Sequence, residues 1–316
     1  MPGLTHIIED NVPQFIRLDL YVAKYLQIIS RSQIKARDVK AKVNGKDVKF
    51  SHIVKKSDRI ELSWDEQPPL DLVPENIPLD IIYEDKRCIV INKPRGMVVH
   101  PGAGNRQGTL ANALYYKMLE KSKTAKSSTN VNNLLKRDSQ RPGIVHRLDK
   151  DTSGVMIAAF DDEAHAFLSE QFKTRKAGKT YIAIVCGVPR EEKGRIETYI
   201  SRDPSDRKRF KTSTNGKHAV TLYTVINKWQ NHSYLLLHPK TGRTHQLRVH
   251  LKHIGCPILG DTIYGRSDRQ FQDASLMLHS KSLKITIPGE SKQSIFSTPV
   301  PERFNTIISK LKKSAW

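Results

Sequence analysis

The sequence predicts an α+β protein made of a small unit and a large one. Short apolar runs with period-two alternation indicate many strands, and helical patterns lie among them without the strict strand–helix alternation of a parallel α/β fold. Residues 65–79 read DEQPPLDLVPENIPL, a proline-rich stretch typical of a semi-stiff linker. We therefore expect a small α/β unit at 15–64 and a mixed α+β domain at 80–316.

The charge of the chain indicates the kind of partner it binds. Its 316 residues carry a formal net charge of +21, which favours a polyanion, above all nucleic acid, over an anionic membrane surface. No apolar run approaches 18 residues and no lipidation motif occurs, so a membrane role is not expected. Three scattered cysteines and a start without a signal peptide predict a cytoplasmic protein with neither a disulfide framework nor a cysteine-rich zinc site.

In the small unit, residues 16–26 have helical spacing, and Ser30 is placed to cap a second helix. Asn44-Gly45 predicts a hairpin turn, because both residues accept the positive φ angles of a type I′ turn. Alternating patterns predict strands at 48–50 and 59–62. The second helix is basic, and RNA contact is a more natural reading of its cations than a solvated face, given the net charge. Those cations are Arg31, Lys35 and Arg37.

In the large domain, the elements follow from periodicity and from capping residues. Strands are expected at 81–83, 88–91, 155–159, 179–185, 219–226, 233–238, 276–278 and 283–287. Helices are expected at 109–119, with Thr109 as N-cap, at 243–254, with Gly255 as the terminating residue, and after Pro301. A further helix should follow an N-cap at Asp161 or Asp162, and its buried residues should be Ala164, Phe167, Leu168 and Phe172. The polar stretch 120–140 predicts a mobile loop, and 202–212 a basic loop that is either solvated or in contact with phosphate.

Reactive side chains are most concentrated at 141–154, RPGIVHRLDKDTSG, just before a predicted apolar strand. Asp149 should lie on the loop that feeds this strand, where catalytic groups are often found. A carboxylate facing a guanidinium stays ionised and can attack an anomeric carbon, although a turn cap is an equally good interpretation of Asp149. His146 is either a base or a ligand of the backbone, and Ser153 is a turn residue because no GxSxG motif surrounds it.

Other familiar sites are not expected. His245, His250 and His253 fall within one predicted helix, but no HExxH spacing or intervening acid accompanies them, so a metal site is not predicted. The glycine-punctuated loop 95–110 lacks both the ending of a P-loop and the spacing of a dinucleotide-binding fingerprint.

Four ordered motifs resemble those of one enzyme family. RPGIVHRLDKDTSG closely resembles HRLDxxTSG, the signature of the RluA/RluD family of pseudouridine synthases. INKPRGMVVHPGAGNRQGTLANAL, KTYIAIVCG and HPKTGRTHQLRVHLKHIGCPILGDTIYG resemble its other motifs, and the agreement runs from about 80 to 288. The upstream loop looks most like the branch that acts on large-subunit ribosomal RNA. Residues 15–64 resemble a small RNA-binding module of a ribosomal protein, although 39–42 lack its usual glycine.

This resemblance implies a largely antiparallel catalytic sheet, ribosomal RNA as partner, and no metal or cofactor; we expect a monomer. It implies that Asp149 engages a uridine as nucleophile or as base, and both remain open. Tyr181 would stack on the uracil and take its ring proton, unless it is a core aromatic, and Arg248 would pair with Asp149, unless it is a surface arginine. Arg147 would enter the RNA stack, while Arg243 and His245 would shape the pocket or contact phosphate.

Two other classes of function compete with this one. A non-catalytic RNA-binding or ribosome-assembly protein would account equally well for the charge and for the small basic unit. A nucleoside or glycoside hydrolase would need a second carboxylate or an activated water, and the motifs offer neither.

Overall fold

The computed structural model describes residues 3–9, 15–26, 34, 39–64, 72–102, 104–124, 142–206 and 208–313. The chain divides into a small unit, Met1–Asp71, and a large unit, Leu72–Trp316. The small unit includes a strand upstream of the predicted range, because β1 (Gly3–Ile7) pairs with β6 (Arg59–Ser63). The large unit begins earlier than residue 80, since Leu72 is buried in its core.

The small unit contains a four-stranded antiparallel sheet in the order β1-β6-β3-β4. β3 (Lys40–Val43) and β4 (Lys46–Asp47) flank the predicted hairpin turn, where φ is 50° at Asn44 and 82° at Gly45. The expected strand at 48–50 is wrong. The chain leaves the sheet there because the carbonyls of Phe50 and His52 accept hydrogen bonds from the first residues of α1 (Leu18–Tyr21).

The predicted helix at 16–26 is only partly a regular helix. It opens as the short strand β2 (Ile16–Arg17), which pairs with β5 (Ile53–Val54), and after α1 it continues as the π-helix η1 (Val22–Leu26). Leu18 and Val22 are buried on the predicted face. The proposed cap Ser30 and the basic residues Arg31, Lys35 and Arg37 lie outside the described residues.

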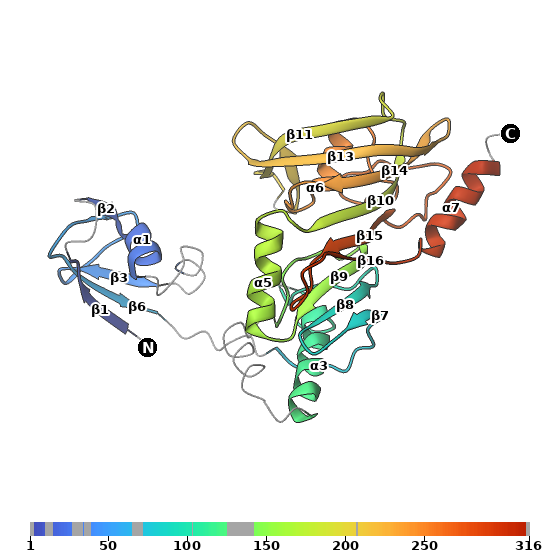
Figure 1. Ribbon diagram of the computed structural model, residues 1–316. Helices are drawn as coiled ribbons and strands as arrows, with labels where there is room; N and C mark the ends of the chain where they lie inside the picture. Colours follow the sequence, from blue (N-terminus) through green and yellow to red (C-terminus); the bar gives the residue numbers. More distant parts are fainter. Residues whose placement is uncertain are drawn as a thin grey trace. The chain divides into compact units, whose positions relative to one another are not determined.

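The large unit is built on a ten-stranded sheet (Figure 1). Its path is β12-β11-β13-β14-β10-β15-β9-β8-β7, with β16 paired to β15, and every pair is antiparallel except β9 with β15. This confirms the α+β class and the largely antiparallel sheet. The strands are β7 (Ile81–Glu84), β8 (Cys88–Lys93), β9 (Ser153–Ala159), β10 (Gly178–Cys186), β11 (Lys193–Arg202), β12 (Phe210–Thr212), β13 (Lys217–Lys228), β14 (His232–Pro239), β15 (Leu278–Ile285) and β16 (Ser294–Ser297).

Helices cover both faces of the strands that lead to the candidate site. β9 is buried along its whole length because alternate side chains enter two different cores. Met156 and Ala158 pack in the core that holds the buried face of α3 (Leu110–Thr124), whereas Val155 and Ile157 pack with α5 (Asp162–Lys173). α6 (Gln246–His253) lies against β11, β12 and β13, and α7 (Glu302–Lys313) closes the chain (Figure 1).

The capping predictions for the large unit are confirmed, but several boundaries differ. The Oδ1 atom of Asp161 accepts the amide of Ala164 at 2.7 Å, Thr109 precedes α3, and Gly255 follows α6 with φ at 77°. α3 runs on to Thr124, so the predicted loop at 120–140 begins later, and residues 125–140 lie outside the described part. The two late strands at 276–278 and 283–287 are one strand, β15, and the 202–212 loop is partly β12.

One predicted core residue is wrong. Phe167 in α5 is 41% exposed, whereas the polar Gln171 is buried on that helix. Gln171 takes the buried position because its amide exchanges two hydrogen bonds with the backbone of Thr286, at 2.8 and 3.0 Å. The described part of the chain contains no helix that is long and apolar enough to cross a membrane.

Candidate active site

Six predicted site residues from four separate segments line one cleft of ≈ 990 Å³ in the large unit. Two come from the loop before β9, one from β10, two from the turn after β14 and one from α6. They are Asp149, Arg147, Tyr181, Arg243, His245 and Arg248. The three basic residues predicted in the small unit are outside the described residues, so the structure does not place them.

The loop that carries Asp149 is fixed by a buried lysine that the sequence analysis did not single out. Lys93 ends β8 and is fully buried, and its ammonium donates to the carbonyls of Pro94, Met97 and Lys150 at 2.8, 2.8 and 3.1 Å. The amide of Gly96 also donates to the Lys150 carbonyl, at 2.9 Å. The two loops are therefore joined directly beside Asp149. Burial lowers the pKa of Lys93 to about 8, and the charges of Asp151 and Asp149 oppose that decrease.

His146 stabilises the same loop through contacts with β9 and α5. Its Nε2 atom accepts the backbone amide of Ile157 at 3.0 Å, and its ring stacks on Phe172 at a centroid distance of 4.4 Å. Burial lowers the pKa of His146 to about 3, so the imidazole is neutral near pH 7. Of the two predicted roles, the backbone ligand is the one observed.

Arg248 contacts two carboxylates. Its Nη1 atom lies 3.5 Å from Oδ2 of Asp149, and its Nε and Nη2 atoms bind Asp261 at 2.8 and 2.7 Å in a bidentate pair. The side chain is buried, so the surface-arginine interpretation is wrong. The predicted contact with Asp149 exists, but the closer partner is Asp261.

Asp261 organises this side of the cleft. Its Oδ1 atom also accepts the amides of Ile263 and Tyr264, both at 2.9 Å. Burial would raise the pKa of Asp261, but the hydrogen bonds and charge of Arg248 hold it below its ordinary value. Asp261 lies within the GDTIYG end of a motif that the sequence analysis quoted, and that motif was the only sequence signal that could have identified it.

His245 connects the same turn to Asp149. It adopts a left-handed conformation with φ at 55°, directly before α6, which explains why the helix begins at Gln246 and not at the predicted Arg243. Its Nδ1 atom is 2.8 Å from the hydroxyl of Tyr264, and its Nε2 atom is 3.9 Å from Oδ2 of Asp149. Burial lowers the pKa of His245, which favours the neutral imidazole.

Tyr181 is buried on β10, with 8% of its surface exposed, and lines the cleft. Burial raises the pKa of its phenol to about 12, and the negative charge of Asp149 adds to this increase. The phenol is therefore protonated near pH 7. An aromatic ring at the wall of a polar cleft offers a flat surface for a planar ring of a ligand.

The cleft is strongly cationic. Its lining includes eight basic side chains and, among the described residues, one carboxylate, that of Asp149. The basic residues are Arg147, Lys173, Arg175, Lys179, Lys240, Arg243, Arg248 and Lys284. Such an excess favours a polyanionic ligand.

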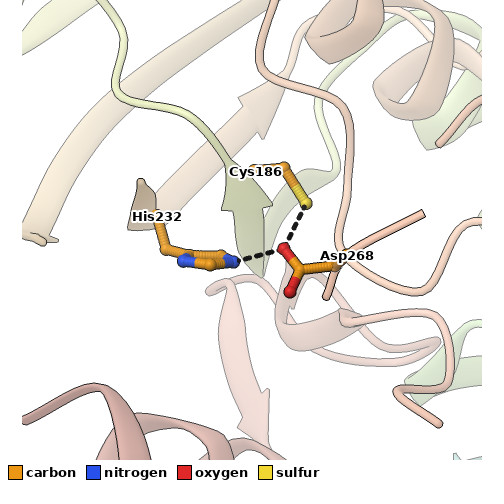
Figure 2. A group of neighbouring side chains, drawn as sticks. All are labelled: Cys186, His232 and Asp268. Carbon is orange, nitrogen blue, oxygen red and sulfur yellow. Dashed lines mark hydrogen bonds and ion pairs between the residues drawn. The ribbon is translucent and has the colours of Figure 1, made fainter. Parts of the chain in front are cut away.

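A second polar group lies at the other end of β10 from Tyr181. Cys186, His232 and Asp268 gather there as the one group in the described part with the composition of a metal site (Figure 2). The Oδ2 atom of Asp268 lies 2.8 Å from Nε2 of His232 and accepts the thiol of Cys186 at 3.7 Å. Arg266 also contacts this thiol. These contacts tie the loop at 266–271 to two neighbouring strands, and a guanidinium beside the sulfur disfavours a cation.

The sequence has known relatives over almost its whole length. Residues 87–253 match the family described as RNA pseudouridylate synthase. The chain is 44% identical to ribosomal large subunit pseudouridine synthase D of Borreliella burgdorferi, over 95% of this chain and 90% of that protein. It is 34% identical to the protein of the same name in Pseudomonas aeruginosa, over 94% and 92%.

The fold also has a solved counterpart. The human RNA pseudouridylate synthase domain containing 4 protein superposes with a TM-score of 0.57 and 28% sequence identity, over 74% of this chain and 93% of the human one.

Proposed function

The chain belongs to the RNA pseudouridylate synthase family, and we propose that it converts specific uridines of large-subunit ribosomal RNA to pseudouridine. Two relatives that cover more than nine-tenths of the chain carry the name ribosomal large subunit pseudouridine synthase D, which supports this choice of RNA. The observation that carries the proposal is the position of Asp149. It lies in a cationic cleft as the one lining carboxylate of the described residues, 3.5 Å from Arg248.

In this proposal Asp149 acts on the sugar of a uridine that has left its strand. The isomerisation breaks the bond between C1′ and N1 and forms one between C1′ and C5, and a proton leaves C5 while N1 gains one. No water enters the products, so a single carboxylate suffices where a hydrolase would use two. The carboxylate serves either as nucleophile at C1′ or as base toward the sugar.

Tyr181 stacks on the uracil in this scheme. Since the pKa of its phenol is raised to about 12, the hydroxyl holds its proton near pH 7. A protonated phenol cannot accept the C5 proton until its own proton has gone elsewhere. We therefore assign stacking to Tyr181 and removal of the C5 proton to the carboxylate of Asp149.

The basic residues divide into two roles. Arg248 is held by Asp261, and its guanidinium faces the carboxylate of Asp149 at 3.5 Å. Arg147 is exposed at the mouth of the cleft, where it can fill the gap that the flipped nucleotide leaves in the RNA stack. Arg243 donates its Nε–H to the carbonyl of His218 at 3.0 Å, so it shapes the turn after β14 and turns its remaining donors toward phosphate.

The test is tritium release from ribosomal RNA labelled at C5 of uracil. The purified wild-type protein should release tritium from unmodified large-subunit RNA, and Asp149→Asn should reduce release to background while binding the same RNA with similar affinity. Asp151→Asn, a change of the same type two residues away, should remain active. Equal release by Asp149→Asn would reject the proposed role of this residue, and free uracil among the products would indicate a hydrolase.

A further inference from the structure

We propose that Lys179 is a substrate-contact residue whose ammonium binds a phosphate oxygen of the RNA next to the target uridine. This inference rests on the proposed function and adds a residue to the same cleft. Lys179 stands two residues before Tyr181 on β10, and both line the cleft. The ring that receives the base and the ammonium that would receive the phosphate therefore come from one strand.

The surroundings of Lys179 leave its ammonium free for a ligand. A Cβ atom placed on Gly242 would lie 3.4 Å from its Nζ atom, so the glycine leaves the ammonium uncrowded at the turn after β14. That turn also carries the exposed Lys240 and the half-buried Arg243. A backbone without side chains beside a cation is a favourable place for a phosphate to approach.

Lys179 differs from the other cations of the cleft. Arg248 binds two carboxylates and Arg243 binds a backbone carbonyl, whereas the remaining five are exposed to solvent. Lys179 is half-buried, and its ammonium makes no hydrogen bond or ion pair with any described residue. Burial alone lowers the pKa of Lys179, with no contribution from a nearby carboxylate. A partly desolvated cation without an anion is unfavourable, and a bound anion would relieve this cost.

A phosphate is the anion that matches this position. The one carboxylate of the cleft faces Arg248 and His245, and RNA supplies one negative charge per nucleotide. A uracil carbonyl would offer only a neutral acceptor. Charge complementarity therefore favours the sugar–phosphate backbone of the bound strand over its base.

The first experiment compares three variants in tritium release and thermal unfolding. Lys179→Met keeps the length of the side chain but removes its charge, and Lys179→Arg keeps the charge. Lys176→Met is the control on an exposed lysine near the same strand that does not line the cleft. We expect kcat/KM to fall about 10- to 100-fold in Lys179→Met, as for a lost charged hydrogen bond. Lys179→Arg should recover part of this loss, and Lys176→Met should change kcat/KM less than about threefold.

The second experiment identifies the phosphate. Synthetic hairpins that contain the converted uridine carry one neutral methylphosphonate at each position in turn. In the wild type, one position close to the target should lower kcat/KM as much as Lys179→Met does, and the same replacement should have no further effect in Lys179→Met. Additive losses at every position would overturn the proposal, as would a Lys179→Met protein that melts lower and is not improved by arginine.

Failure of the proposed function would look different. A wild-type protein that releases no tritium from any ribosomal RNA would reject the synthase assignment whatever Lys179 does. In that case RNA affinity is measured in the methylphosphonate scan in place of tritium release. The scan still shows whether the contribution of one phosphate to RNA binding requires Lys179.

Discussion

Arg248 binds Asp261 more closely than it binds Asp149. The two contacts with Asp261 measure 2.7 and 2.8 Å, whereas the contact with Asp149 measures 3.5 Å. Asp261 is held by the backbone amides of Ile263 and Tyr264 and accepts two hydrogen bonds from Arg248, so it holds the guanidinium in a single orientation. Arg248 can therefore face the carboxylate of Asp149 without binding it tightly, which leaves that carboxylate free to interact with the substrate.

Replacing Asp261 by Asn should therefore impair catalysis more than RNA binding. The amide keeps the shape of the side chain but loses its charge and can accept at one position only, so Arg248 is free to turn fully toward Asp149. We expect kcat to fall about 10- to 100-fold, equivalent to about 1.4–2.8 kcal/mol. Single-turnover tritium release and RNA affinity, measured on the same preparation, give the comparison.

Asp268→Asn is a useful control, because Asp268 is also a hydrogen-bonded aspartate of the large unit but lies at the other end of β10. It should lower stability without a specific loss in kcat. If Asp261→Asn retains the wild-type kcat, the orientation of Arg248 does not depend on this carboxylate.

The sequence predicted those parts of the site that lie within local motifs. Asp149, Tyr181 and Arg248 could be named because each stands in a motif of recognisable composition, and the cleft unites them. Asp261 and Lys93 could not be assigned roles, since these depend on segments that meet only in the folded chain. Lys93 is 57 residues from the carbonyl of Lys150, and a lysine is ordinarily expected at the surface.

The strands were predictable for a similar reason. The uninterrupted apolar runs in β8 and β9 indicate strands buried on both faces, and that pattern is local. The start of α6 was not predictable, because His245 adopts a left-handed backbone conformation that is uncommon for a residue other than glycine, and its ring contacts Tyr264, which is 19 residues away. Phe167 was misplaced because periodicity alone cannot show that a glutamine, Gln171, has two backbone partners.

Gly154 is a position where any side chain would disturb the site. It has φ at 119°, and a Cβ atom there would lie 2.1 Å from the carbonyl oxygen of Ser280 on β15. We expect Gly154→Ala to lower the free energy of unfolding by more than about 3 kcal/mol, because backbone strain adds to a clash. Urea unfolding measures this change, and tritium release should fall as the neighbouring loop of Asp149 moves.

The matched control is Gly289→Ala. Gly289 also has a positive φ, 92°, but nothing lies within 4 Å of its Cβ position. Only the strain of the left-handed backbone applies at Gly289, so the free energy of unfolding should fall by about 1–2 kcal/mol and activity should be normal. Equal losses at the two glycines would show that β9 and β15 can move apart without cost.

Two buried histidines should make the protein sensitive to acid. His250 and His279 are 0% and 1% exposed, and burial, as the largest cause, lowers the pKa of each to about 4. Both rings are held by hydroxyl groups of neighbouring residues, at 2.8 to 3.1 Å. In the unfolded chain a histidine titrates near 6.5. The unfolded state therefore binds more protons below that pH, and stability decreases as the pH falls from about 6.5 toward 4.

The expected slope is about 1.4 kcal/mol per pH unit for each histidine, or about 3 for the pair, and His146, whose pKa is also lowered by burial, adds a similar amount. Urea unfolding at pH 7, 6 and 5 measures it in a range where carboxylates of ordinary pKa remain ionised. His279→Gln keeps a polar side chain and should reduce the slope by about 1.4 kcal/mol per pH unit. His253→Gln changes an exposed residue and should change the slope much less, because the charge of His253 is only the second cause of the lowered pKa of His250. An unchanged slope in His279→Gln would mean that its imidazole is already protonated in the folded protein, so that Ser153 and Thr298 stabilise the charged ring and not the neutral one.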